Sequence, residues 1–446
     1  MGYSFYASIT LDHTQVTTSS STYLRVKVFG DARFATIAHG GELHNASGYD
    51  LIFATDISGA HPLTFELEEN SYSATTGAGV WWVRIPFPSD SSDTVFYVVY
   101  SNAGISTYQG DTNGTWGSDY DAVVHFNASG SQIDSTATGN NLTSTGGSPS
   151  YTAGLIGYAF ESGGSDYIYQ NPCSGINSDG PCTLSCWYKL ASATVSGNVC
   201  IVGMGGNGGT NCRALALPGA ATFVVDTATV DPACALVSST NWVNMVLAIP
   251  SAGTPNNMLV YLNGVLQTTA GGNNTAFALT AAGKYFTVGC VPGSPGAGDF
   301  MAGLIDEFRY APSQLDAGLI ATEYQSQQPG STFYALGPQE VVPPPGSSVL
   351  VQQAILELQA QTDPNARVQQ AIIELLTSND PNAIVQQIVL ELQVLPGNPF
   401  PPVNTQPFSI ILRGVKRWPI GQKPFVCPVD ERQYNDAMTE LTKWIG

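Results

Sequence analysis

Two glutamates separated by one residue are the first candidates for chemistry in this sequence. Glu66 and Glu68 lie in Leu63-Thr-Phe-Glu-Leu-Glu-Glu69, which predicts a strand, and side chains two residues apart on a strand share a face. Glycoside hydrolases use paired carboxylates as acid and base, so this is the one candidate pair for hydrolysis. Because the segment fits an ordinary strand pattern, the sequence favours a solvated or calcium-binding face over catalysis.

The histidines form no motif for nucleophilic or metal-assisted catalysis. They are scattered, and no two are spaced as His-x-x-x-His. We therefore expect a protein without catalytic residues and without enzymatic activity. The five histidines are His13, His39, His44, His61 and His125.

Three aspartates in separate segments are candidate ligands for calcium, the only cofactor that the sequence suggests. Hard oxygen ligands from scattered loops suit this ion, and Asp306 could share a site with Asp134 or with Asp166. The alternative is structural, with each carboxylate hydrogen-bonded to a neighbouring loop.

Aromatic side chains on loops and strand ends are candidate contacts for sugars, because an exposed ring offers a flat apolar surface. Trp187 lies in mid-strand and is expected in the core. For Tyr167 and Tyr169, sugar contact and core packing are equally compatible with the sequence. The candidates for ligand binding are Tyr151, Tyr167, Tyr169 and Trp116.

The composition indicates the elements that must position these side chains. The chain has 446 residues, of which 43% are hydrophobic and 11% charged, with 47 glycines and 28 prolines. This suits a β-rich protein with many turns and excludes acidic disorder and collagen. A net charge of −19 argues against a nucleic-acid partner. No apolar run is long enough for membrane insertion, and no export signal is recognisable at the N-terminus.

The eight cysteines include no Cys-x-x-Cys pair, so a structural zinc site is not expected. Buried thiols are the simplest interpretation. A disulfide between Cys173 and Cys182 is the alternative.

Residues 1–118 read as short strands separated by turns and predict a β-sandwich. Four segments occur in a characteristic order: 48–56, 63–68, 82–86 and 97–102. They resemble an uncharacterised β-domain that precedes concanavalin-like domains in bacterial, archaeal and phage surface proteins. That family usually has Tyr-Gly-Asn where this chain has Tyr100-Ser101-Asn102.

Residues 119–336 continue with longer strands that alternate in character and carry regular aromatic residues. Such strands supply one buried face each, as two packed antiparallel sheets require. Asn263-Gly264 predicts a hairpin, and a short helix is expected over 313–325. The segments 183–189, 242–246, 259–264 and 303–309 resemble, in order and spacing, the strands of a LamG or concanavalin A-like jelly roll.

A proline-rich linker over 337–349 leads to three 17-residue repeats in 350–400. Within each repeat, apolar residues recur at helical spacing, and Asp-Pro pairs resemble helix starts. The pattern predicts three short helices that oligomerise the chain, and it resembles Val-x-Gln repeats of phage virion proteins. The predicted contact residues are Val351, Ile355, Leu358, Val368, Ile372, Leu375, Val385, Val389 and Leu392.

Residues 401–446 carry a net charge of +2, which leaves −21 on the first 400 residues. We expect a small α+β module that anchors the chain to an acidic partner, with a solvated basic face as the equal alternative. The anchoring residues are Arg413, Lys416, Arg417 and Lys423.

The expected fold class is mainly β: two antiparallel β-sandwich (jelly-roll) domains, a helical repeat segment and a small C-terminal α+β module. The resemblances imply a non-enzymatic structural or adhesive protein of a phage virion, a homo-oligomer (trimer favoured) that contacts other virion proteins and a cell-surface glycan. A cell-surface carbohydrate-binding protein is the alternative, and a concanavalin-fold glycoside hydrolase is a third.

Overall fold

The computed structural model describes most of the first 344 residues and two strands beyond them. The described ranges are 2–17, 23–176, 180–193, 199–205, 212–217, 222–226, 233–235, 240–251, 257–269, 285–290, 298–344, 367–375 and 386–394.

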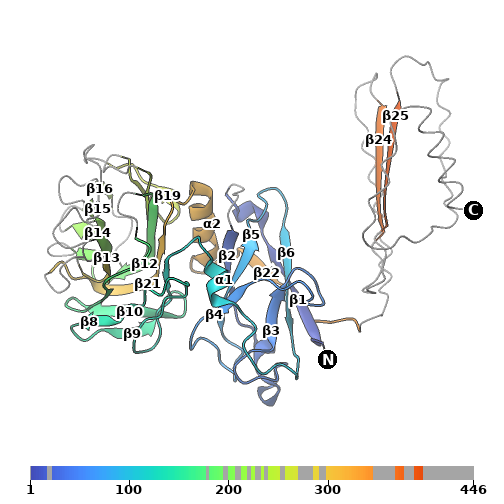
Figure 1. Cartoon of the computed structure of the whole chain (residues 1–446), viewed down its shortest axis with the longest axis horizontal. Helices are drawn as coiled ribbons and strands as arrows, with labels where there is room; N and C mark the ends of the chain where they lie inside the picture. Colours follow the sequence, from blue (N-terminus) through green and yellow to red (C-terminus); the bar gives the residue numbers. More distant parts are fainter. Residues whose placement is uncertain are drawn as a thin grey trace, which may run out of the picture. The chain divides into compact units, whose positions relative to one another are not determined.

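The first domain consists of two antiparallel sheets (Figure 1). One has the order β22-β1-β6-β3, with β23 also paired to β1; the other has the order β2-β5-β4. A single apolar cluster contains side chains from both sheets, including Ile9, Val26, Phe53 and Val83. The strands are β1 (Phe5–Leu11), β2 (Tyr23–Phe29), β3 (Leu51–Ala54), β4 (Phe65–Leu67), β5 (Val80–Pro86), β6 (Thr94–Tyr100), β22 (Tyr334–Leu336) and β23 (Glu340–Val341).

Short helices connect these strands. Helix α1 (Thr112–Trp116) begins at Asp111, whose carboxylate accepts the Gly114 amide. The 3₁₀ turns are η1 (His13–Gln15), η2 (Ala32–Phe34) and η3 (Ile37–His39).

The second domain is a jelly roll of two larger antiparallel sheets. The eight-stranded sheet has the order β19-β18-β17-β12-β21-β10-β9, with β7 paired to β21; the seven-stranded sheet has the order β16-β15-β14-β13-β20-β11-β8. Its strands are β7 (Ala122–Val124), β8 (Ser144–Gly146), β9 (Ser150–Ala153), β10 (Tyr158–Gly163), β11 (Tyr167–Gln170), β12 (Cys182–Leu190), β13 (Val199–Gly205), β14 (Cys212–Leu217), β15 (Thr222–Asp226), β16 (Ala233–Ala235), β17 (Val243–Ile249), β18 (Leu259–Leu262), β19 (Val265–Leu266), β20 (Tyr285–Val288) and β21 (Ala302–Ala311).

Two local predictions in this domain are confirmed. Asn263 and Gly264 form the turn between β18 and β19, and both have positive φ, at 51° and 73°, as a tight hairpin requires. Helix α2 (Ala317–Gln327) lies where a helix was expected, and the Asp316 carboxylate caps it by accepting the Leu319 amide at 2.7 Å.

Residues 334–342 return from the jelly roll to complete the first sheet. Strands β22 and β23 pair with β1, in the registers Ile9 to Leu336 and Phe5 to Val341. The predicted start of the linker at residue 337 is therefore wrong, because the backbone as far as Val342 is hydrogen-bonded to the first domain. The first compact unit comprises residues 1–342.

The helical prediction for the second and third repeats is wrong. Residues Arg367–Leu375 and Gln386–Val394 form strands β24 and β25, which pair antiparallel with Ile372 opposite Val389 (Figure 1). Both segments are rich in valine and isoleucine, whose branched side chains favour strands. The first repeat, Val385 and the predicted module at 401–446 lie outside the described residues.

The two sandwich domains share buried surface. Strand β17 alternates, so that Met245 and Leu247 face the jelly-roll core, whereas Val246 and Ala248 belong to the apolar cluster of the first domain. Leu319 and Ile320 of α2 join the same cluster. The outer face of the eight-stranded sheet thus packs against the first domain. No helix in the described ranges has the length and apolar character needed to cross a membrane.

Candidate functional site

One face of the three-stranded sheet carries the glutamate pair. Lys27 on β2 lies opposite Trp82 on β5, which lies opposite Glu66 on β4, so these side chains form a row. Glu66 and Glu68 reach the same imidazole and share a face, as the sequence predicted. The prediction that this face is solvated is wrong: the two residues are 5% and 3% exposed, because the jelly roll covers them.

The jelly roll contributes its polar groups through a β-bulge on β21. Ser185 and Trp187 of β12 pair with Arg309 and Asp306, so two residues of β21 lie opposite one of β12. Glu307, inside the bulge, has a φ of 53°, an uncommon value for a residue with a side chain. The bulge brings the Glu307 carboxylate to the Arg309 guanidinium on the face turned toward the first domain, at 2.7 Å.

His125, just beyond β7, lies between the carboxylates of the two domains. Its Nδ1 is 2.8 Å from Glu307 Oε1 and 3.7 Å from Glu68 Oε1, while its Nε2 is 3.3 Å from Glu66 Oε2. We call Glu66, Glu68, His125, Glu307 and Arg309 the interdomain cluster. All five side chains are buried.

Two indoles hold the carboxylates of the first domain. Trp82 Nε1 donates to Glu68 at 2.7 Å, and Trp116 Nε1 donates to Glu66 at 2.5 Å. The Ser135 hydroxyl also donates to Glu66. Such hydrogen bonds replace the water that each carboxylate loses on burial.

The same indoles also contact the cations of the cluster. The His125 ring stacks on Trp82 with centroids 5.5 Å apart and an interplanar angle of 19°. The Arg309 guanidinium lies 4.4 Å from the Trp82 ring centroid and 4.8 Å from that of Trp116. Aromatic faces attract cations, so the two tryptophans compensate both signs of charge.

The buried charges shift one another's pKa values. Burial disfavours the charged His125 imidazole, but the Glu307 and Glu66 carboxylates outweigh it and raise its pKa well above the ordinary value. Burial, opposed by His125 and reinforced by Glu307, raises the pKa of Glu68 to about 8. Burial also acts on Glu307, yet His125 and Arg309 hold its pKa below the ordinary value.

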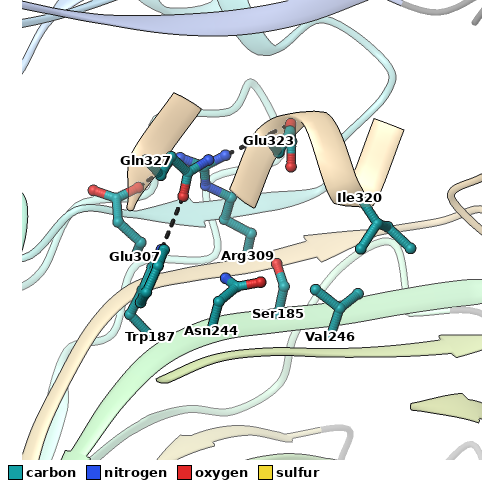
Figure 2. A pocket seen from close by; sticks show the side chains of 9 residues that line it. All are labelled: Ser185, Trp187, Asn244, Val246, Glu307, Arg309, Ile320, Glu323 and Gln327. Atoms are coloured by element: carbon teal, nitrogen blue, oxygen red, sulfur yellow. Dashed lines mark hydrogen bonds and ion pairs between the residues drawn. The ribbon is translucent and has the colours of Figure 1, made fainter. Parts of the chain in front are cut away.

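A cavity of about 10 Å³ lies beside Arg309, between β21, β12, β17 and α2 (Figure 2). Trp187 Nε1 donates to Gln327 Oε1 across it at 2.9 Å. Arg309 Nε and Nη1 have no hydrogen-bond partner, and Nη1 is 3.9 Å from Glu323. The volume suffices for a single water molecule, not for a sugar. The cluster can therefore hold protons or a small cation but offers no room for a glycoside substrate.

A second set of side chains lies on the outer face of the seven-stranded sheet. Tyr167 stacks on Phe300 (centroids 5.7 Å apart, 22°) and on Tyr169 (6.1 Å, 28°), and Tyr169 is 6.2 Å from Tyr285. All four rings are half-exposed, whereas Ile168 between the two tyrosines points into the core. We call Phe300, Tyr167, Tyr169 and Tyr285 the aromatic ladder.

Glycine at residue 146 makes room for one ring of the ladder. Gly146 on β8 pairs with Tyr167, and a Cβ at that position would lie 2.0 Å from Tyr167 Cζ. The Tyr167 ring therefore occupies the space that a side chain at residue 146 would fill.

The other predicted sugar contacts do not lie on this surface. Trp116 is fully buried beside the interdomain cluster, where Glu66 and His125 pack against it, so its predicted exposure is wrong. Tyr151 on β9 packs against the jelly-roll core beside Phe160, and its hydroxyl is buried.

The three candidate calcium ligands stabilise separate turns. Asp134 accepts the amides of Val123, Thr136 and Asn140. Asp166 accepts those of Ser148 and Gly163. Asp306 accepts the amide of Ile156, and burial raises its pKa well above the ordinary value. These contacts match the structural alternative, and calcium binding stays a prediction.

Groups of three or more ligand-type side chains occur elsewhere within the described ranges. Glu68, His125 and Glu307 form a buried group, and Asp12, His13 and Asp93 form an exposed one. In each, the potential ligand atoms lie within 4.8 Å of one another.

Sequence reasoning missed two members of the interdomain cluster as functional candidates, His125 and Arg309. The spacing of the histidines gave no indication of a role for His125, because the glutamates that it contacts come from distant segments. Adjacent acidic and basic residues in Asp306-Glu-Phe-Arg309, on a strand with apolar neighbours, were the only available signal.

The remaining predicted residues are two cysteines, the contact residues of the repeats and the basic residues near the C-terminus. Cys173 and Cys182 are both buried thiols and form no disulfide, as the simplest interpretation held. The predicted contact residues Val368, Ile372, Leu375, Val389 and Leu392 lie on β24 and β25. The predicted anchoring residues at 413–423 lie outside the described residues.

A comparison with protein families supports the jelly roll. Residues 162–321 match the laminin G family described as the concanavalin A-like lectin/glucanases superfamily. This confirms the resemblance inferred from the strand pattern. No curated protein sequence matches the chain.

Several solved structures resemble the chain. One is domain 4 of AbnA, a GH43 extracellular arabinanase from Geobacillus stearothermophilus, in complex with arabinotriose. It is 20% identical, and the match covers 46% of this chain and 98% of the arabinanase domain, with a TM-score of 0.36. A structure of botulinum neurotoxin type C, described as dependent on interaction with two ganglioside molecules for cell entry, is 15% identical. It covers 46% of this chain and 51% of the toxin chain, with a TM-score of 0.36. Trypanosoma rangeli sialidase is 13% identical, with coverages of 46% and 32% and a TM-score of 0.34. The chain thus spans about half of the toxin structure.

Proposed function

We propose that this chain, whose residues 162–321 match the concanavalin A-like lectin/glucanases superfamily, is a non-enzymatic adhesive protein that binds glycans through the aromatic ladder. The ladder is the observation that carries the proposal. Its half-exposed rings form a row from Phe300, which precedes β21, through Tyr167 and Tyr169 on β11 to Tyr285 on β20.

A stacked row of rings suits an extended saccharide. The C–H faces of a sugar ring are apolar and pack on an aromatic face, while its hydroxyl groups remain in water. The tyrosine hydroxyls at the ring edges can hydrogen-bond those hydroxyls. Because Tyr167 and Tyr169 are fixed by a rigid strand, little conformational entropy is lost on binding.

The burial of the glutamate pair supports a binding function rather than hydrolysis. Glu66 and Glu68 are hydrogen-bonded to indoles in the domain junction, and the neighbouring cavity of about 10 Å³ admits no sugar. A glycosidase needs both carboxylates to flank the scissile bond.

Glycan binding is tested with immobilised polysaccharides and arabino- or sialo-oligosaccharides. We expect Tyr167→Ala and Tyr169→Ala each to weaken binding about tenfold, which corresponds to a loss of about 1.4 kcal/mol. Tyr97→Ala is the matched control, because Tyr97 is a half-exposed strand tyrosine with an edge-to-face partner, Tyr6, in the first domain. Unchanged binding in both ladder variants, with folding intact, would refute the ladder as the binding surface.

We further propose that the protein is a virion component, with the segment after residue 343 forming the oligomeric anchor. The domain pair and the repeats, which resemble those of phage proteins, support this assignment. Quantitative mass spectrometry of density-purified particles and of washed cell envelopes tests it. Many copies per particle are expected, whereas enrichment in envelopes would favour a cell-surface adhesin.

A further inference from the structure

We propose that Glu68, His125 and Glu307 form a binding site for a divalent transition-metal cation, with Zn²⁺ as the representative ion, that joins the two sandwich domains. Glu68 comes from the first domain, whereas His125 and Glu307 come from the jelly roll. The site is separate from the aromatic ladder and does not depend on the proposed glycan function.

The spacing of the three side chains suits coordination. His125 Nδ1 is 2.8 Å from Glu307 Oε1 and 3.7 Å from Glu68 Oε1. Zinc bonds to nitrogen and oxygen of about 2.1 Å in a tetrahedron place neighbouring ligand atoms roughly 3.4 Å apart. The two observed separations bracket this value, so an ion requires only small movements of the side chains. One imidazole with two carboxylates is a donor set that zinc accepts.

Further residues already occupy the positions of supporting partners. Trp82 donates to the Glu68 carboxylate at 2.7 Å, and Arg309 donates to Glu307 at 2.7 Å. His125 Nε2 makes no hydrogen bond but lies 3.3 Å from Glu66 Oε2. A proton on Nε2 facing Glu66 leaves the Nδ1 lone pair for a metal, which is the carboxylate–histidine–metal arrangement.

A metal and a proton compete for the same position in the cluster. The three carboxylates face His125 and Arg309, and the buried Lys27 ammonium also acts on Glu68 and Glu307. Glu68 accepts a hydrogen bond from the neutral Trp82 indole. With a proton on Nδ1, His125 pairs closely with Glu307 and leaves Glu68 at 3.7 Å. A divalent ion replacing that proton contacts both carboxylates and adds one positive charge to the cluster. Burial makes such compensation important, since an unpaired buried carboxylate is costly.

The test uses the full chain, unfolded with chelator present and refolded with or without Zn²⁺. We expect about one zinc ion per chain after desalting, measured by mass spectrometry, and a higher Tm with the ion. Co²⁺ serves as a spectroscopic probe, because its spectrum distinguishes nitrogen and oxygen ligands from the cysteine thiolates.

Glu68→Gln is the decisive variant, because it keeps the size and an oxygen acceptor for Trp82 but removes the charge. We expect its zinc affinity to fall at least tenfold. His13→Gln is the matched control, because it disrupts only the exposed Asp12, His13 and Asp93 group, and it should bind like the unmodified protein.

Two outcomes would overturn the proposal. In the first, the protein retains no zinc, its Tm does not rise with zinc, and Glu68→Gln is at least as stable as the unmodified protein. This result would assign the cluster to protons alone. The other is equal zinc retention by Glu68→Gln, or a thiolate spectrum with Co²⁺, which would place the ion elsewhere.

Discussion

At the scale of single residues, the buried indole of Trp116 hydrogen-bonds a charged side chain. Its ring is fully buried, and its Nε1 donates to the carboxylate of Glu66. Trp187 is equally buried, but its Nε1 donates to the neutral amide oxygen of Gln327 at 2.9 Å. The two tryptophans therefore allow the same hydrogen bond to be compared with a charged and with a neutral acceptor.

We predict that Trp116→Phe destabilises the protein more than Trp187→Phe. A hydrogen bond to a charged group contributes about 1.5–3 kcal/mol and a neutral one about 0.5–1.5 kcal/mol. Both variants lose the same ring volume, so their difference reports the acceptor. Urea unfolding monitored by circular dichroism measures it. Equal losses would mean that Ser135 and His125 suffice to compensate Glu66.

At the scale of elements, strand β2 meets the C-terminal end of helix α2 at Lys27. Lys27 Nζ donates to the Gln327 carbonyl at 3.1 Å and lies 4.4 Å from the Phe29 ring centroid. The negative end of the helix dipole favours a cation there. Burial nevertheless lowers the pKa of Lys27 to about 8, although Glu307 and Glu68 oppose the shift. A cleft of about 360 Å³ beside Lys27 connects this packing to solvent.

We predict that the contribution of Lys27 to stability rises with pH between about 8 and 10.5. In this window the unfolded chain, with an ordinary lysine pKa of 10.5, binds more protons than the folded chain. The free energy of unfolding of the wild type relative to Lys27→Met should rise by roughly 3 kcal/mol across it. Subtracting the variant's free energy of unfolding at each pH removes the effects of other titrating groups. A difference that stays constant with pH would contradict the shifted pKa.

At the scale of the whole molecule, the chain segment at 337–342 ties the C-terminal side of the jelly roll to the first domain. Arg33 donates to the Gly337 carbonyl at 2.9 Å, and the Tyr100 hydroxyl donates to Gln339 at 3.0 Å. The Val342 amide donates to the Ser4 carbonyl. The two sandwiches therefore share strands as well as a buried face.

We predict that a chain ending at residue 344 keeps the Tm that the first compact unit has in the full chain. A chain ending at residue 336 should be less stable by about 2 kcal/mol. The shorter chain loses strand β23 and the hydrogen bonds of Arg33 and Tyr100. Differential scanning calorimetry of both truncations measures the effect. Identical transitions would mean that β23 contributes nothing to the first sheet.

Local sequence patterns predicted much of the fold. Alternation in 183–189 and 242–246, turn chemistry at Asn263-Gly264 and the helical stretch expected over 313–325 depend on neighbouring residues alone. Each segment contains the expected element. The same alternation placed Glu66 and Glu68 on one face and left Tyr167 and Tyr169 open between core and surface. The structure places both tyrosine rings on the surface, because the pairing of β11 with β8 and β20 determines which side chains lie beside them.

The repeats show why a periodic pattern can mislead. Valine and isoleucine at helical spacing also satisfy a strand when a second copy pairs with it, as β24 does with β25. That partner is remote in sequence, and periodicity within one copy carries no information about it.

The sequence by itself determined the strands, the turns and the jelly-roll family of residues 162–321, because these follow from local alternation and turn chemistry. Only the tertiary structure brought Glu68, His125 and Glu307 together and buried them. Their proximity depends on two sheets packing face to face and on a bulge in β21. Burial then changed their chemistry, since a carboxylate that water would solvate on a lone sheet must find a proton, a donor or a cation inside the junction.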